Sequence, residues 1–216
     1  MRAIFFIVFN VLIINQSILS QSQQGDVFVS GKMGRLDIED YTPRLAFGAQ
    51  LDVMATDHIG LHWSFLGGNR YIHANAGPII GVTIGSFIAA TDDQNNNNNI
   101  GAGILFGILI SAIPEGINYE IDLTINSSIA PYISPLQMDY IRNKDQATGV
   151  DTFVGLGVGT SLNTYLMQGK IKASIFGEGK VHYFNPGHPG LFYGFSIGYR
   201  LNKRDYEKGD PFGGFE

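Results

Sequence analysis

Strict alternation of apolar and polar residues is the feature that most limits how this chain can fold. Segment 119–129 (YEIDLTINSSI) shows it best. One face would carry Tyr119, Ile121, Leu123, Ile125 and Ile129, and the other Glu120, Asp122, Thr124, Asn126 and Ser128. Because successive side chains of a strand point to opposite faces, a period of two this long predicts a strand between an apolar and a polar environment.

The same period recurs along most of the chain, in segments of about 10 residues, the length that a tilted membrane strand needs. Segment 100–113 (IGAGILFGILISAI) is too short for a membrane helix and is diluted by glycines, which favours a strand there too. We predict strands at 44–55, 58–66, 77–89, 100–113, 119–129, 151–162, 170–183 and 191–201, with a weaker candidate at 26–34.

A soluble sandwich or lipocalin-like barrel would alternate as well, with its apolar side inward. Two observations favour a membrane barrel. The polar faces carry mixed charge and many glycines, which suits a narrow lumen better than a solvated exterior. The apolar faces carry aromatic residues, several of them near strand ends, as in the aromatic girdles of membrane barrels. These residues are Trp63, Tyr119, Tyr183, Tyr193 and Tyr199.

We therefore predict an all-β fold, an antiparallel up-and-down transmembrane β-barrel of about eight strands. The number would be about ten if residues 26–34 and 70–76 each form a separate strand. A soluble, secreted lipid-binding β-barrel is the alternative. Long polar loops are expected at 90–99 and 134–149, on the same side of the barrel.

The first 22 residues have the form of a secretory signal peptide: Arg2, an apolar stretch over 3–14, and Ser20 and Ser22 at a small-x-small cleavage site. The chain has no cysteine, which excludes a lipoprotein signal, disulfides and thiol chemistry. The expected organisation is a signal peptide at 1–22, a barrel at 26–201 and a polar tail at 202–216.

Charged residues on the polar faces are the candidate site residues. The interior of an eight-stranded barrel is only wide enough to be filled by side chains, and a charge buried there without a partner is costly. Four acids and four bases therefore predict a self-neutralising network that closes the lumen; a path for an ion or solute is the alternative. The eight residues are Arg44, Asp52, Glu120, Asp122, Lys172, Glu178, Lys180 and Arg200, and His58, His62 and His182 share their faces.

The sharpest expectation concerns segments 119–129 and 170–183, whose polar faces carry acids and mostly bases respectively. The carboxylates of Glu120, Asp122 and Glu178 should lie within reach of bases in one interior network. The bases are Lys172, Lys180, Arg44 and Arg200.

Motifs for catalysis are weak. His62 and Ser64 would share a face, as do a histidine and serine of outer-membrane lipid A deacylases, but Phe65 follows here in place of asparagine and no orienting acid follows at a recognisable spacing. The similar stretch His73-Ala74-Asn75 lacks the serine. We expect no enzyme, cofactor or metal site. The formal charge of −5, without a basic patch, argues against nucleic acid as a partner.

The signal peptide, the glycine-rich alternating strands and the final strand GLFYGFSIGYRL resemble small outer-membrane β-barrel proteins of the OmpA/OmpX type, above all the porin-family barrels of Bacteroidota. The resemblance covers about residues 26–201 and implies a place in the outer membrane of a Gram-negative cell. Outer-membrane lipids, and other envelope proteins, are then the expected partners. A non-enzymatic structural or surface-interaction role with a closed lumen is expected, with a small pore or solute-binding barrel as the alternative.

Overall fold

The structure is a computed structural model that describes residues 22–90, 105–110, 112–142, 149–184 and 186–204. The predicted signal peptide therefore lies almost entirely outside the described residues, as do most of the predicted tail and the Asn-rich part of the predicted loop at 90–99.

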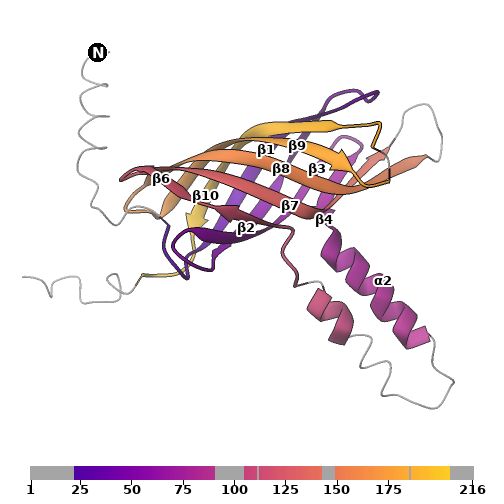
Figure 1. Cartoon of the computed structure of the whole chain (residues 1–216), viewed down its shortest axis with the longest axis horizontal. Coiled ribbons are helices and arrows are strands. Elements are labelled where there is room, and N and C mark those ends of the chain that lie inside the picture. Colours follow the sequence, from indigo (N-terminus) through magenta and orange to yellow (C-terminus); the bar gives the residue numbers. More distant parts are fainter. Residues whose placement is uncertain (1–21, 91–104, 111, 143–148, 185, 205–216) are drawn as a thin grey trace, which may run out of the picture.

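Ten strands form a closed antiparallel β-barrel (Figure 1). Neighbouring strands around the barrel are antiparallel, and β1 closes the barrel by pairing with β10 from Phe28↔Arg200 to Ile38↔Gly190. The strands are β1 Val27–Ile38, β2 Arg44–Met54, β3 Ile59–Gly68, β4 Tyr71–Asn75, β5 Gly116–Tyr119, β6 Ile121–Thr124, β7 Ser127–Arg142, β8 Val150–Leu166, β9 Ile171–His182 and β10 Gly190–Arg200.

The barrel is eight strands around, because its fourth strand is divided into β4, β5 and β6. Both β4 and β5 pair with β3 on one side and β7 on the other, and β6 continues along β7. The predicted eight-stranded barrel is thus confirmed. Segments 26–34 and 70–76, the two optional strands, correspond to β1 and β4.

Two predicted strands are helical instead. Segment 77–89 lies in helix α2, Ala76–Ala90, and residues 105–110 of segment 100–113 are helical. Glycines explain the difference: a Cβ added to Gly107 would lie 2.9 Å from the carbonyl oxygen of Gly81, so only glycine lets the two helices approach this closely. A short apolar run fits a buried strand or an apolar helix equally well, and the helix pair decides between them.

Segment 119–129 is also not one strand. The chain turns at Ile125–Asn126, where the backbone N–H of Asn126 donates to Thr124 Oγ1 (3.3 Å) and the hydroxyls of Thr124 and Ser127 lie 2.6 Å apart. Hydroxyl and amide residues favour such turns, so alternation can continue through a hairpin. The predicted loop at 134–149 is shorter than expected, because β7 continues to Arg142.

The two ends of the barrel differ. Residues 22–26 and 201–204 lie at one end, which we call the proximal end, together with the turns at 55–58, 125–126 and 167–170. The connections at 39–43 and 69–70 lie at the opposite, distal end, as does the one that joins β9 to β10. In the part of the chain that the structure describes, no helix is both long enough and apolar enough to cross a membrane.

The outer face of the barrel is apolar and the lumen is polar. Phe47, Ile133, Ile175 and Ile197 are among the many large apolar side chains exposed on the outside. Tyrosines lie outward near both ends, Tyr119 and Tyr199 proximally and Tyr183 and Tyr193 distally. This arrangement is the reverse of a soluble barrel and matches the outward apolar band and aromatic girdles of membrane barrels.

Candidate functional site: the polar lumen

Four layers of side chains fill the lumen from the proximal to the distal end. They are a proximal cluster around Glu120, a central chamber beside Lys32, a distal cluster around Asp139, and an apolar cap. Inward positions alternate with outward ones along every strand, so each layer draws on several strands.

Glu120 is the centre of the proximal cluster and is 1% exposed. It follows β5, and its carboxylate accepts from Lys172 Nζ (3.1 Å), Tyr165 Oη (2.5 Å) and Asn163 Nδ2 (3.3 Å). Lys172 also lies 5.6 Å from the ring centroid of Phe28. A buried carboxylate with this many donors stays ionised and holds three strands together.

Residues that the sequence assigned to the start of a tail bind to the proximal end of the barrel. Arg204 Nη2 lies 2.7 Å from Asp26 Oδ2, and both side chains are buried. Asn202 Oδ1 accepts from the backbone N–H of Val27 at 2.8 Å. Arg200 Nη1 lies 3.9 Å from Asp26 Oδ1. Residues 202–204 are therefore bound to the barrel, because they cap the first strand.

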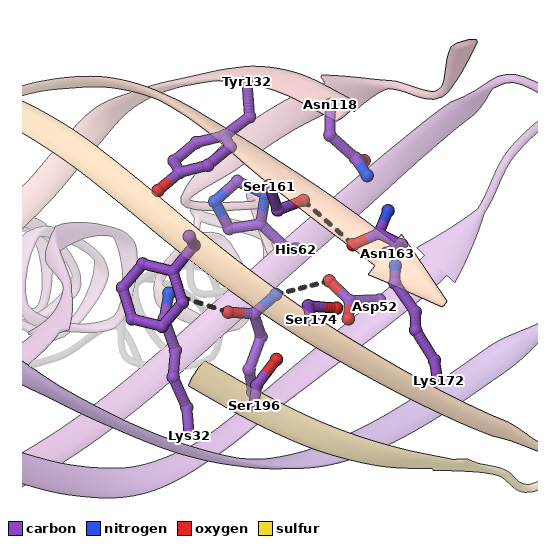
Figure 2. A pocket seen from close by; sticks show the side chains of 12 residues that line it. Lys32, Asp52, His62, Asn118, Tyr132, Ser161, Asn163, Lys172, Ser174 and Ser196 are labelled. Carbon is purple, nitrogen blue, oxygen red and sulfur yellow. Dashed lines mark hydrogen bonds between the residues drawn. The ribbon is translucent and has the colours of Figure 1, made fainter. Parts of the chain in front are cut away.

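The central chamber has a volume of about 40 Å³ and polar walls (Figure 2). Lys32 Nζ donates to Gln50 Oε1 (2.9 Å), and Gln50 Nε2 donates to Asp52 Oδ1 (2.7 Å). On the adjacent strand β3, His62 is the register partner of Asp52, and its Nε2 lies 2.9 Å from Ser134 Oγ. A space of this size holds one or a few water molecules and no organic solute.

Asp139 is the centre of the distal cluster. Lys180 Nζ lies 3.0 and 3.1 Å from its two carboxylate oxygens, and Tyr71 Oη donates to it at 2.7 Å. Lys180 also lies 3.7 Å from Glu178, whose carboxylate accepts from Gln137 Nε2 at 2.8 Å. These side chains are all buried, and each charge in the group has a counter-charge.

Ser64, His73 and Asp139 approach one another as in a hydrolase triad. His73 Nε2 lies 2.9 Å from Ser64 Oγ, and His73 Nδ1 lies 2.8 Å from Asp139 Oδ1. However, Ser64 Oγ donates to Glu115 Oε2 (2.5 Å), and Glu115 Oε1 lies 3.0 Å from His73 Nε2. The ring nitrogens of His73 are thus shared with Glu115 and with Lys180 Nζ, which lies 3.3 Å from His73 Nδ1, and the serine hydroxyl is taken up by Glu115. The arrangement therefore fits a hydrogen-bonded interior better than an activated nucleophile.

The apolar cap fills the distal end of the lumen. Tyr41 packs over it, with its ring 5.6 Å from that of Phe153 and its hydroxyl donating to Asp151 at 2.8 Å. Burial and this hydrogen bond raise the pKa of Tyr41 to about 12, so the phenol remains a donor at neutral pH. The buried residues of the cap are Leu36, Ile38, Ala46, Leu66, Tyr71, Ile141, Phe153, Phe176 and Phe192.

The eight predicted site residues divide between these layers and the surface. Glu120 meets Lys172 and Glu178 meets Lys180, while buried Asp52 accepts from Gln50 and buried Arg200 lies 3.9 Å from Asp26. Asp122 is exposed on β6 near the proximal turn. Arg44 lies at the distal rim, where it donates to the backbone carbonyls of Asn69 and Arg142. The expected single network is thus a set of separate clusters, without Asp122 and Arg44.

The histidines also divide. His62 and His182 are buried in the lumen, whereas the ring of His58 contacts the Glu120 carbonyl at the proximal rim (3.2 Å). Among the described residues, no group of three or more His, Cys, Asp or Glu side chains is arranged to hold a metal ion.

Sequence reasoning missed several buried ionic residues: Asp26, His73, Glu115, Asp139 and Arg204. A signal for Asp139 was present, because Gln137 and Asp139 alternate with Leu136, Met138 and Tyr140 inside the predicted loop. The sequence around Glu115 gave no such signal, because this residue follows the helical segment. Only the tertiary structure brings its side chain into the lumen.

Two solved structures are similar to this chain at low sequence identity. The N-terminal β-barrel domain of Pseudomonas aeruginosa OprF matches with a TM-score of 0.52 and 10% identity, over 83% of this chain and 100% of that one. A de novo designed transmembrane β-barrel matches with a TM-score of 0.36 and 10% identity, over 84% of this chain and 99% of that one. No protein-family model and no curated protein matches the sequence. The match to the OprF domain shows that the chain has an outer-membrane-type β-barrel fold.

Proposed function

We propose that this chain is an integral outer-membrane β-barrel with a closed lumen and a non-enzymatic role, either structural or in surface contacts made by its distal loops. One observation carries the proposal: ion pairs and an apolar cap fill the lumen, and the central chamber is only about 40 Å³. Such an interior stabilises the barrel and gives a solute no path.

The place in the membrane rests on the inverted distribution of side chains. An apolar outer face and a charged interior suit surrounding lipid, with outer-membrane lipids and other envelope proteins as the partners. The signal peptide predicted at 1–22 supports export of the barrel, and the OmpA/OmpX-type resemblance supports a Gram-negative envelope.

We expect the folded barrel to give no discrete channel openings in a planar lipid bilayer, because the apolar cap and the distal cluster block the lumen. Single-channel recording is the measurement, with heat-modifiable migration on a gel to show that the inserted protein is folded and a porin as the positive control. Reproducible openings of one unit size would instead support the alternative, a small pore.

A serine-reactive fluorophosphonate probe is expected to leave Ser64 unmodified in the folded barrel. Ser64 is 6% exposed and its hydroxyl donates to Glu115, so it is neither accessible nor activated. Mass spectrometry of the treated protein gives the readout, with a serine hydrolase in the same sample as the control. Labelling that disappears in Ser64→Ala would contradict a non-enzymatic role.

A further inference from the structure

A helical hairpin leaves the barrel wall at mid-height. In the register of β3, Phe65 pairs with Ala74 of β4, and His62 pairs with Gly116 of β5. The chain therefore leaves the fourth strand after Asn75 and returns at Glu115, beside the middle of β3. Figure 1 shows α2 running obliquely outward from the wall, inclined toward the distal end.

Hydrogen bonds hold the base of this hairpin in place. Glu115 N donates to the His62 carbonyl (2.9 Å), and the Glu115 carboxylate accepts from Ser64 N (2.9 Å), which replaces the missing strand contacts. Asn75 Nδ2 donates to the Ile113 carbonyl (2.8 Å), and Asn75 Oδ1 accepts from Gly77 N (2.8 Å). Specific hydrogen bonds thus fix the junction at which the chain leaves the barrel wall, and the strand does not simply fray there.

The two helices contact each other through small residues and expose their large apolar side chains. Gly77, Gly81, Gly85 and Gly107 are buried between them or against the junction, while large apolar side chains point away. Val82 is 65% exposed and Phe87 is 70% exposed. Close approach through small residues, with large apolar residues outward, is how helices associate within lipid. In water, such a surface would leave its whole apolar area unprotected.

The apolar surface of the hairpin continues the outer face of the barrel. No charged residue occurs in 76–90 or 105–113. At the foot of α2, an apolar hollow of about 480 Å³ lies on the barrel wall, with Val29, Leu51, Trp63 and Phe65 among its lining residues. The hairpin and the barrel wall therefore present one continuous surface to the same surroundings.

We propose that this hairpin lies within the bilayer, in the leaflet nearest the distal end, with lipid acyl chains covering its outer surface and filling the hollow. This inference rests on the proposed membrane location of the barrel. A 15-residue helix is about 22 Å long, enough to cross one leaflet of about 15 Å obliquely from mid-height. The polar stretch of the sequence begins directly after Ala90, where a helix of this length reaches the headgroups.

Spin labelling tests the proposal, and the cysteine-free chain makes it direct. Single variants Val82→Cys and Phe87→Cys would carry a nitroxide on the hairpin. Ile175→Cys on the outer barrel face and Thr42→Cys in a distal loop are the matched lipid and water controls. Each folded variant is reconstituted in phosphatidylcholine vesicles, and collision with oxygen and with a water-soluble nickel chelate is measured.

The expected result is that labels at 82 and 87 match the label at 175: high oxygen collision and loss of the nickel effect seen at 42. Nickel collision at 82 and 87 equal to that at 42, with 175 still shielded, would overturn the hairpin proposal alone. Spin–spin broadening at 82 and 87 that vanishes on dilution with unlabelled protein would also overturn it, because a second copy would then cover the hairpin. Nickel collision at 175 would instead overturn the membrane location itself.

Discussion

Replacing Asp139 by alanine is expected to destabilise the folded barrel by about 3–5 kcal/mol, the usual cost of removing one partner of a buried ion pair. Asp139 is 1% exposed and accepts from Lys180 and Tyr71, so its loss removes the nearer of the two carboxylates that Lys180 contacts and leaves the Tyr71 hydroxyl without its acceptor. Urea unfolding in lipid vesicles, followed by heat-modifiable migration, measures the change.

Two further variants separate the charge effect from packing. Asp122→Ala is the matched control, since Asp122 is exposed, and it should unfold at the same urea concentration as the parent. The triple variant Asp139→Leu, Lys180→Met and Glu178→Gln should recover much of the loss, because the ammonium is removed together with both carboxylates that it contacts. If Asp139→Ala unfolds like Asp122→Ala, the distal cluster does not stabilise the barrel.

Placing arginine at Ile175 is expected to cost about 2–4 kcal/mol, the penalty for a cation on the lipid face near mid-bilayer. Ile175 is 61% exposed in the middle of β9, paired with Phe195 on one side and Leu162 on the other. The folded fraction in lipid vesicles, read from heat-modifiable migration over a urea series, gives the size of the effect.

Ile125→Arg is the comparison variant for this experiment. Ile125 lies in the turn between β6 and β7, at the proximal end, where the penalty falls to about 0–1 kcal/mol. Equal stability of Ile175→Arg and Ile125→Arg would show that the middle of the apolar face is not in lipid, and would favour a soluble barrel.

Most barrel strands could be predicted because their environments differ on the two sides. In β10, Tyr193, Phe195, Ile197 and Tyr199 alternate with glycine and serine, and the structure places these four outward. A one-residue error in such a strand would turn its apolar side chains into the lumen, so the sequence strongly specifies its register.

The helical hairpin could not be predicted from the same pattern. In segment 77–89 the alternating residues Ile80, Val82 and Ile84 coexist with glycines at every fourth position, 77, 81 and 85. The period of two fits a strand, and the glycine at every fourth position fits one face of a helix, so both structures are compatible with these residues. Only the approach of Gly107 to Gly81, a contact between distant parts of the chain, selects the helix.

The ionic clusters show the same division. The sequence places Lys172, Lys180, Glu178 and Glu120 on polar faces, and the structure buries all four side chains. The turn at Ile125–Asn126 keeps Asp122 out of the lumen, and the continuation of β7 brings Asp139 in. The points at which loops end and the stagger of the strands decide both outcomes. The alternation of apolar and polar residues gives no information on either.

The sequence by itself determined the class of fold and the side of each regular strand that faces lipid, because alternation is a local property of an extended backbone. Tertiary structure alone decided which charges meet in the lumen, where the fourth strand opens, and how the hairpin is packed. Those outcomes depend on the position of each residue along the barrel axis. Barrel closure and strand stagger together set these positions for residues that are distant in the sequence.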